Sequence, residues 1–486
     1  MIYAALAARH GYRVGVLGHR AQANTYRHKG HVFTYQPERF YGLSTSPVIG
    51  RVMNELSLSM EMRNKPQAAG PIVQIATPEM RLDVPEHPAQ WRRELERELP
   101  NLHEQLLAFE DWAAEQTEAS NVVFADEILY PPDGLRATGR YEALVDGIKV
   151  LSQEAKRNLP GPIASIHDRP QFKTVIGAPL SHLTQVRHDP AGALTLARLW
   201  THLRAGLYRL PEGIDGFKRL FLRKLREQCG DYRPSDVVNR LVFRRRRVKE
   251  VLLNERGETL GCELLVANMD PRYLGQLIRP ADRVERYHLN ASTRPLAGWR
   301  ITINLAVNPK VIPAGMGSEV VLVQDPKSNL IGSNCIWLSR PGSIAPSVRD
   351  NGPGPGVLCL TVILPAEGGI PTLGAVQRLT SHVLDRLRSI IPWFDDHILA
   401  MDLPCIGRDE QSGQSILRPQ HLLPIARDPE AGMLGVGFHS PATPYKNVIM
   451  TGDACFSGLG IEGSFMAAVQ TLERTRRLVK IKNTLA

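Results

Sequence analysis

The sequence contains little cysteine, and its cysteines follow no metal-binding pattern. Only six residues of 486 are cysteine: Cys229, Cys262, Cys335, Cys359, Cys405 and Cys455. No two of them form a C-x-x-C pair, so neither a structural zinc site nor a disulfide framework is indicated. We expect these thiols to be reduced, as in a cytoplasmic protein.

Long apolar runs and nucleic-acid-binding motifs are also lacking. No run of about 18 apolar residues occurs, so no membrane-spanning helix is predicted. The first residues, MIYAALAARHGYRVGVLG, lack the basic segment and the cleavage site of a signal peptide. The net charge of +10 is spread over many segments. It indicates a modestly basic surface, and no nucleic-acid partner is predicted.

The sequence carries no catalytic or metal-ligand signature. There is no P-loop and no Ser-His-Asp arrangement, and the histidines His167, His182, His188 and His202 are scattered. We therefore predict no metal ion, and the catalytic residues are not indicated. With 43% hydrophobic residues, the chain can still form two or three domains with a large core.

The most informative segment runs from Asn447 to Arg477 and reads NVIMTGDACFSGLGIEGSFMAAVQTLERTRR. Its apolar run Val448–Met450 predicts a buried strand, and the residues from Ser464 to Val479 predict a helix. Between them lies a glycine-rich turn that begins at Gly452. Such a layout points backbone N–H groups at an electron-rich ligand. The alternative is a turn that needs glycine only for its backbone angles.

A second organised segment covers residues 208–271. Pro211, Gly213 and Gly216 precede an amphipathic helix. The strands DVVNRLVF and VKEVLLN, a turn at Glu255–Glu258 and the strand CELLVAN follow it, and the segment ends in VANMDP. This pattern predicts a helix followed by a β-meander.

Together these two segments resemble the FAD-dependent phytoene desaturase and amine oxidase superfamily, and the VANMDP end is most similar to the phytoene desaturase branch. The resemblance implies an α/β fold with a discontinuous, Rossmann-like FAD-binding domain and an inserted α+β substrate domain. The FAD-binding domain would comprise residues 1–85, 206–285 and 425–486. The substrate domain would comprise residues 86–205 and 286–424.

The resemblance also implies which residues would hold FAD. In the family, the residue at Asp453 binds the ribityl and diphosphate region, and the valine at Val238 contacts adenine through its backbone. The backbone from Ile461 to Gly463 would face the pyrimidine side of the isoalloxazine, where a helix N-terminus stabilises the negative charge of a reduced flavin. The implied cofactor-binding residues are Val238, Gly452, Asp453, Gly460, Ile461, Glu462 and Gly463.

The N-terminal region departs from the family pattern. The chain begins at Met1 inside an expected helix, so the family's first strand and its GxGxxG motif do not precede it. Either a start placed too late or a real loss of this element would explain the difference. Gly18 stands where the family has an acidic residue for the adenosine ribose, and Ala21–Asn24 stands where the family has a Gly-Gly-Arg-like turn.

Two functional hypotheses follow. The first is an FAD-dependent oxidoreductase that removes a hydride equivalent, as a desaturase or dehydrogenase does, from an apolar, carotenoid- or polyprenoid-like substrate. The second is a degenerate, non-catalytic member of the fold. It would bind FAD weakly or not at all and act as a partner or scaffold protein.

Four further features each allow two interpretations. Arg39 either meets a diphosphate or acidic substrate group, or lies at the surface. Arg244–Arg247 form either a solvated turn or a contact with an anionic membrane surface, which would make this a peripheral membrane protein. Cys455 lies near the flavin or packs as a small apolar residue. Trp393 and Phe394 close a pocket or anchor the packing.

The remaining segments carry secondary-structure predictions. Residues 86–205 are expected to be mostly helical, and the runs RITINLAV, EVVLV, CIWLS and GVLCLTVIL between residues 299 and 364 predict strands. The spacing of apolar residues from Thr372 to Ile391 predicts a helix that Pro392 ends. The residues from Pro424 to His439 are expected to form a loop.

Overall fold

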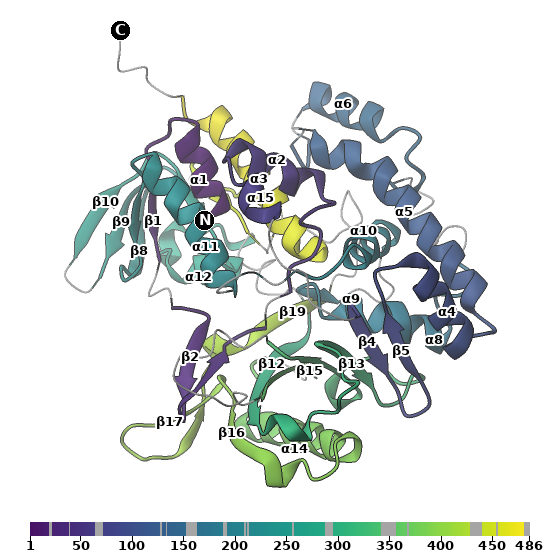
Figure 1. Cartoon of the computed structure of the whole chain (residues 1–486). Coiled ribbons are helices and arrows are strands. Elements are labelled where there is room, and N and C mark those ends of the chain that lie inside the picture. The colour runs from purple at the N-terminus through teal and green to yellow at the C-terminus, as the bar shows by residue number, and fades with distance from the viewer. Residues whose placement is uncertain are drawn as a thin grey trace.

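A large mixed sheet and two short pairs of parallel strands are joined by helices, so the predicted α/β class is confirmed (Figure 1). This computed structural model describes residues 1–18, 22–37, 39–63, 71–126, 129–132, 134–151, 163–187, 192–208, 210, 213–254, 257–286, 295–341, 356–366, 369–427, 440–452 and 455–480.

Two parallel strand pairs lie on the side of the molecule that carries the chain's N-terminus. Strand β1 (Gly15–Leu17) pairs with β7 (Asp231–Arg233), and β11 (Leu265–Ala267) pairs with β20 (Val448–Met450). The run VIM therefore forms the buried strand that its apolar side chains predict. Among the described strands, β1 pairs only with β7, so one of its edges has no strand partner.

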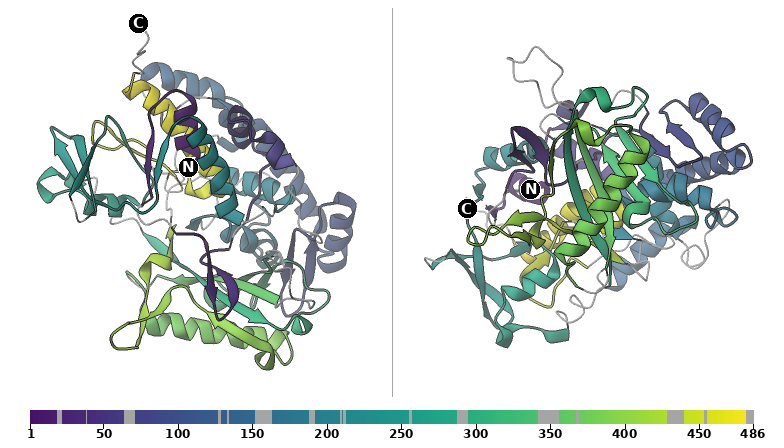
Figure 2. Two further views of the ribbon diagram at one scale, coloured as in Figure 1. Left: turned by 60° about the vertical axis from the view of Figure 1, so that its left-hand side comes forward. Right: turned by 90° about the horizontal axis from the view of Figure 1, so that it is seen from below.

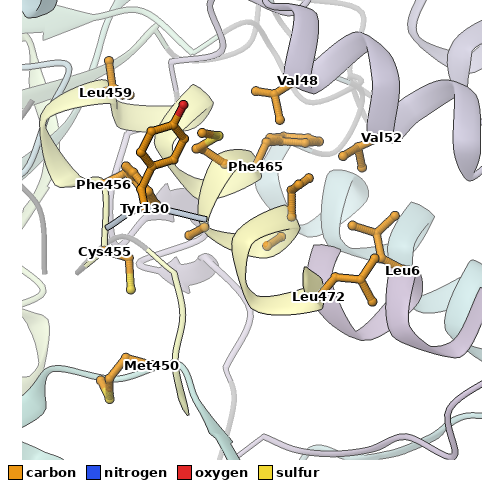
Figure 3. Close-up of a cluster of buried hydrophobic side chains, with 14 of the residues drawn as sticks. Leu6, Val48, Val52, Tyr130, Met450, Cys455, Phe456, Leu459, Phe465 and Leu472 are labelled. Atoms are coloured by element: carbon orange, nitrogen blue, oxygen red, sulfur yellow. The ribbon is translucent and has the colours of Figure 1, made fainter. Parts of the chain in front are cut away.

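Four helices pack around these strands and share one hydrophobic core. They are α1 (Ile2–Arg9), α2 (Pro47–Glu55), α11 (Gly213–Glu227) and α15 (Gly460–Leu478). Figure 3 shows Phe465 and Leu472 of α15 in this core, near Val48 of α2 and Leu6 of α1. Helix α15 begins at Gly460, four residues earlier than the sequence predicts, so the last glycines of the turn lie in its first helical turn.

An antiparallel meander follows α11. It consists of β8 (Val238–Arg244), β9 (Arg247–Leu253) and β10 (Glu258–Gly261). The first two strands are as predicted. The predicted third strand, CELLVAN, is wrong as a meander strand, because β10 takes that place and only Leu265–Ala267 of that run is extended, as β11 beside β20.

The large sheet has the strand order β5-β4-β13-β14-β15-β12-β19-β6, and β16 also pairs with β12. Its central strands confirm the four predicted runs: β12 (Leu296–Val307), β13 (Glu319–Val323), β14 (Cys335–Ser339) and β15 (Gly356–Pro365). The outer strands are β4 (Val73–Ala76), β5 (Arg81–Val84), β6 (Val186–Arg187), β16 (Ile398–Asp402) and β19 (Leu423–Arg427). Since β19 is a strand, the loop prediction for Pro424–His439 is wrong at its start; residues 428–439 lie outside the described part.

Helix α14 (Leu373–Ile390) covers one face of the large sheet, as its apolar spacing predicts. Figure 1 shows it on the side of the sheet away from α15, and the view from below in Figure 2 shows it crossing the strands. The side chain of Thr372 accepts a hydrogen bond from the Ala375 amide (3.2 Å) and caps the helix, which contributes about 1 kcal/mol. Val376, Val383 and Leu387 are buried against alternate residues of β12 and β15.

Helices form most of the described chain between residues 86 and 205, as predicted. They are α4 (Pro88–Glu98), α5 (His103–Ala125), α6 (Leu135–Val145), α8 (Pro170–Phe172), α9 (Ala178–Ser181) and α10 (Ala193–Arg204), with a π-helical turn at Lys173–Gly177. The smaller elements are β2 (Thr25–His28), β3 (His31–Thr34), α3 (Ser59–Arg63), α12 (Pro271–Gln276), β17 (Ile406–Arg408) and β18 (Ser415–Leu417). Within the described ranges, no helix is long and apolar enough to cross a membrane.

Candidate functional site

The glycine-rich turn lies at the carboxyl ends of the parallel strands β11 and β20. Gly452 follows β20 with a φ of 84°, and a Cβ at this position would lie 1.9 Å from Oδ1 of Asn268, the residue that follows β11. The amide of Thr451 donates a hydrogen bond to the carbonyl of Ala267 (3.0 Å), which holds the two strand ends together. In α/β sheets, ligands bind in the crevice beyond the carboxyl ends of parallel strands.

The start of α15 is the second part of the candidate site. Gly460 has a φ of 55°, and a Cβ there would lie 1.7 Å from the hydroxyl oxygen of Tyr41 and 2.7 Å from the carbonyl oxygen of Leu183. The hydroxyl of Tyr41 donates a hydrogen bond to that carbonyl (3.0 Å). Only glycine fits here, because the backbone approaches its neighbours closely in a conformation that other residues rarely adopt.

The other sequence-predicted site residues are distributed as follows. Ile461 contacts the two core clusters on either side of it, and Gly463 lies against the carbonyl of Phe456, which a Cβ would approach to 2.1 Å. Val238 starts β8, opposite Leu253 of β9, in a sheet separate from β20. Asp453 lies outside the described residues. The structure thus brings Gly460, Ile461, Glu462 and Gly463 into one helical turn.

Glu462 is buried, and its carboxylate is held by three side chains. Arg198 of α10 donates from Nε to Oε2 (2.8 Å) and from Nη2 to Oε1 (2.6 Å). Ser46, the cap of α2, donates to Oε1 (2.6 Å), and Nε2 of His202 lies 3.3 Å from the same oxygen. The guanidinium of Arg198 also lies 3.7 Å from the ring centre of Phe124. The carboxylate therefore links α15 to α10 and α2, and a ligand would meet Glu462 only through its backbone.

The ionised form of the Glu462 carboxylate is strongly favoured over the protonated form. Burial alone would raise the pKa of Glu462, but Arg198 and His202 outweigh burial and hold that pKa well below its ordinary value of 4.5. Because Glu462 is in the first turn of α15, its negative charge also meets the positive end of the helix dipole.

A second polar region lies on the face of the large sheet that turns away from α14. Along β12, Ile301, Ile303 and Leu305 belong to the core shared with α14, so the alternating residues Arg300, Thr302 and Asn304 face the other side. The register places Thr302 opposite Thr361 of β15, which is opposite Trp337 of β14. In the next row, Asn304 is opposite Cys359 of β15. Cys359 is in turn opposite Ser339 of β14, and Ser339 is opposite Glu319 of β13.

Arg39 lies on this polar face and not at the surface. Its side chain is 5% exposed, and Nη2 donates to the hydroxyls of Ser339 (3.2 Å) and Thr361 (3.1 Å). The guanidinium lies 4.2 Å from the ring centre of Trp337, and Nε lies 3.8 Å from Oε2 of Glu319. That oxygen also accepts from Trp337 Nε1 and from the Ser339 hydroxyl, both at 2.6 Å. Burial lowers the pKa of Arg39, and Glu319 partly offsets this.

Arg300 and His182 carry further polar atoms into the same region. Arg300 Nη2 donates to the carbonyl of Thr184 (2.6 Å). His182 is buried, its Nε2 lies 3.6 Å from the sulfur of Cys335, and its ring contacts the edge of Trp337. Burial lowers the pKa of His182, and the nearby Arg300 and Arg39 lower it further, so the imidazole is neutral at pH 7.

Sequence reasoning missed Arg300, Glu319 and Arg198 as partners. The alternation in RITINLAV is a signal that could have marked Arg300, because a strand with one apolar face places its other residues on the opposite face. No local signal pairs Arg198 with Glu462, since 264 residues separate them.

The structure also bears on the other three features for which the sequence allows two interpretations. Cys455 is fully buried in the core beside α15, which agrees with packing. Phe394 is buried against α14, whereas Trp393 is 78% exposed. All four residues of Arg244–Arg247 are exposed, and Arg245 and Arg246 form a left-handed hairpin turn.

The end of β1 has no room for the acidic side chain that the family carries there. A Cβ on Gly18 would lie 2.6 Å from both the Cα and the carbonyl oxygen of Pro234. The backbone after β7 therefore passes directly over this position. A carboxylate side chain cannot be placed at Gly18 without moving that backbone.

No protein-family model matches the chain, and no curated protein sequence matches it. The chain is similar to the crystal structure of an oxidoreductase from Methanosarcina mazei, with a TM-score of 0.56 and 12% identity over 97% of each chain. It is similar to the PF1083 protein from Pyrococcus furiosus, with a TM-score of 0.55 and 12% identity over 99% of this chain and 96% of that one. It is also similar to wild-type putrescine oxidase bound to putrescine, with a TM-score of 0.54 and 12% identity over 98% of this chain and 96% of that one. These similarities establish a shared fold.

Proposed function

We propose that this chain is an FAD-dependent oxidoreductase. The observation that carries the proposal is the pair of left-handed glycines, Gly452 and Gly460, at the carboxyl ends of β11 and β20 and at the start of α15. This is where a dinucleotide cofactor binds in doubly wound α/β folds. The fold is shared over nearly the whole chain with an oxidoreductase and with putrescine oxidase, an enzyme whose cofactor binding has been redesigned.

The residues fit a flavin better at the ring end than at the adenosine end. At the ring end, Gly452, Gly460 and Gly463 let backbone approach where side chains cannot, and the α15 N-terminus offers positive potential. The backbone of Ile461–Gly463 would hold this end, Asp453 would bind the ribityl and diphosphate region, and the Val238 backbone would meet the adenine. At the adenosine end, Gly18 offers no carboxylate to the ribose. We therefore expect retention of FAD to depend mainly on the ring end.

Bound FAD would accept a hydride equivalent from the substrate. The chain's own residues would do three things. The first turn of α15 would stabilise negative charge near the flavin ring, Tyr41 and Trp337 would exclude water, and the polar face of the large sheet would orient the substrate.

The substrate class we propose is apolar, carotenoid- or polyprenoid-like, with desaturase-type removal of hydrogen. Its support is the resemblance of residues 208–271 to the phytoene desaturase branch, together with the apolar cluster of Leu183, Val321, Val323 and Trp337 near the polar face. Pro211 of that motif lies outside the described residues.

A membrane surface is the partner that we propose for the basic hairpin. Arg245 and Arg246 are exposed at its tip, and each cation near an anionic surface contributes about 1 kcal/mol. A peripheral contact of this kind would give the enzyme access to apolar substrates in the bilayer.

The second candidate function is a non-catalytic partner or scaffold with the same fold. Its support is the close contact of Pro234 with Gly18 and of Tyr41 with Gly460, both of which restrict space where the cofactor would lie. The test that separates the two candidates is the absorbance spectrum of the purified chain after incubation with FAD and gel filtration. Flavin bands that elute with the protein support the oxidoreductase, and their absence supports the scaffold.

A further inference from the structure

We propose that Arg39 and Arg300 form a binding site for a carboxylate on the polar face of the large sheet. We further propose that the substrate is an apolar molecule with one carboxylate end. The substrate assignment rests on the proposed function, whereas the carboxylate site does not.

The first observation is the incomplete hydrogen bonding of Arg39. Its side chain is 5% exposed, and Nη2 is engaged by Ser339 and Thr361. Its Nε is buried and has no hydrogen-bond partner within the described part of the chain. Glu319 Oε2, 3.8 Å from Nε, is too far away to accept a hydrogen bond from it. A buried guanidinium N–H without an acceptor is costly, so this atom is a donor for a ligand.

The second observation is that Arg300 has no carboxylate partner. Within the described ranges, its hydrogen bond goes to the neutral carbonyl of Thr184, its Nε is buried without a partner, and it forms no ion pair. Glu319 cannot supply the missing charge, since β13 lies three strands from β12 in the order β13-β14-β15-β12. At about 4.8 Å per strand, this is a separation of about 14 Å.

The two arginines are close enough to share one small anion. Arg39 contacts Thr361, which is opposite Thr302, and Thr302 is two residues from Arg300 on the same face. Thr361 and Arg300 are therefore diagonal neighbours, whose Cα atoms lie about 7–8 Å apart, and the Arg300 side chain can span that distance to the Arg39 guanidinium held at Thr361. Burial, together with the nearby charge of Arg39, lowers the pKa of Arg300 to about 9.

The charge balance selects a monoanion. Arg39 and Arg300 carry two positive charges, Glu319 supplies one negative charge, and His182 is neutral because burial lowers its pKa. Among these four residues one positive charge is left, which a single carboxylate neutralises. Arginine suits this role because its planar fork matches the two carboxylate oxygens. The neighbouring apolar residues Val321, Val323 and Trp337 suit an apolar body.

The experiment is calorimetric titration of the purified chain without FAD, using octanoate as the anionic probe and octan-1-ol as its neutral analogue. We expect saturable binding of octanoate and at least tenfold weaker binding of octan-1-ol. Arg300→Gln should weaken octanoate binding by tenfold or more. Glu319→Gln should strengthen it, because this change releases Arg39 from its internal carboxylate.

The matched control is Arg204→Gln. Arg204 of α10 is also a buried arginine, but it is paired at 2.7 Å with Glu110 of α5, so the change should leave octanoate binding unaltered. Arg300→Lys serves where the glutamine variant does not fold. It keeps the charge but loses the planar fork, so it should bind octanoate with intermediate affinity. Far-UV circular dichroism verifies the folding of each variant.

Three results would overturn the site: equal affinity for octanoate and octan-1-ol, unchanged affinity in folded Arg300 variants, or weaker binding in Glu319→Gln. Octyl phosphate that binds more tightly than octanoate would overturn the assignment to a carboxylate. Flavin retention is measured separately on the same samples. Octanoate binding without flavin retention keeps the site and refutes the substrate assignment together with the proposed function, whereas flavin retention without octanoate binding refutes the site alone.

Discussion

Arg198 and Glu462 form a buried, two-pronged ion pair that joins α10 to α15 across 264 residues of sequence. Both side chains are at most 1% exposed. The pair fixes the first turn of α15 against α10, and the hydroxyl of Ser46 extends the contact to α2. The proposed flavin-ring end therefore rests on a charge pair between distant segments.

Replacing Glu462 with Gln should destabilise the protein by about 3–5 kcal/mol, because it leaves the buried Arg198 without its counter-ion. The free energy of unfolding in urea measures this. Asp385→Asn is the matched control, since Asp385 pairs with Arg388 at 2.6 Å on the exposed side of α14 and such a pair contributes at most about 1 kcal/mol. Equal losses in the two variants would contradict the assigned role of the buried pair.

The same pair predicts a pH dependence. The pKa of Glu462 is lower in the folded protein than its ordinary value of 4.5, so the folded state binds this proton less readily than the unfolded state does. The ion pair therefore contributes its full stability above about pH 5 and loses it as pH falls below 4.5. The stability difference between the parent and Glu462→Gln should shrink from pH 7 to pH 3. A difference that stays constant over this range would refute the prediction.

Gly460→Ala should cost more than about 2 kcal/mol, since a left-handed backbone is strained for alanine and the new methyl group meets the Tyr41 hydroxyl. Tyr41→Phe removes that oxygen, so the double variant should lose less than the sum of the two single losses. Gly139→Ala in α6 is the control. Its Cβ would meet nothing within 4 Å, and we expect a gain of up to about 1 kcal/mol. Additive losses in the double variant would show that Tyr41 and Gly460 are not in contact.

The basic hairpin provides a test of the proposed membrane partner. Arg245→Asn with Arg246→Gly keeps residues that accept the left-handed turn and removes two charges. Sedimentation with anionic vesicles should weaken by about 2 kcal/mol, close to thirtyfold. Arg92→Gln with Arg93→Gln removes two exposed charges from α4 and should have little effect. Equal weakening in both variants would reduce the contact to a general effect of net charge.

The sequence predicted the elements that depend on local patterns. The helix from Thr372 to Ile391 and the strands between residues 299 and 364 follow from apolar periodicity and clear ends, and both are confirmed. Periodicity marked CELLVAN as extended but could not show that β10 completes the meander, because the choice of strand partner is a long-range matter. The strand β19 was missed for the same reason, since its partner is β12.

The candidate site was less accessible from the sequence. The glycines were found because Gly452 and Gly460 have a local conformational cause. The polar face was missed because it is assembled from β12, β13, β14 and β15, and Arg39 joins it from a segment about 260 residues away from Arg300 in the sequence. Because Arg39 lies on this buried face, the interpretation in which Arg39 meets an acidic group is favoured over the one in which it lies at the surface.

The most direct test of the account is a titration of the chain with FAD, followed by flavin absorbance in the fraction that elutes with the protein. The account predicts saturation at one flavin per chain, and it predicts a clear loss of bound flavin in Gly460→Ala under conditions where that variant is folded. Absence of saturable binding in the parent would contradict the oxidoreductase proposal and leave the non-catalytic partner as the function of this fold.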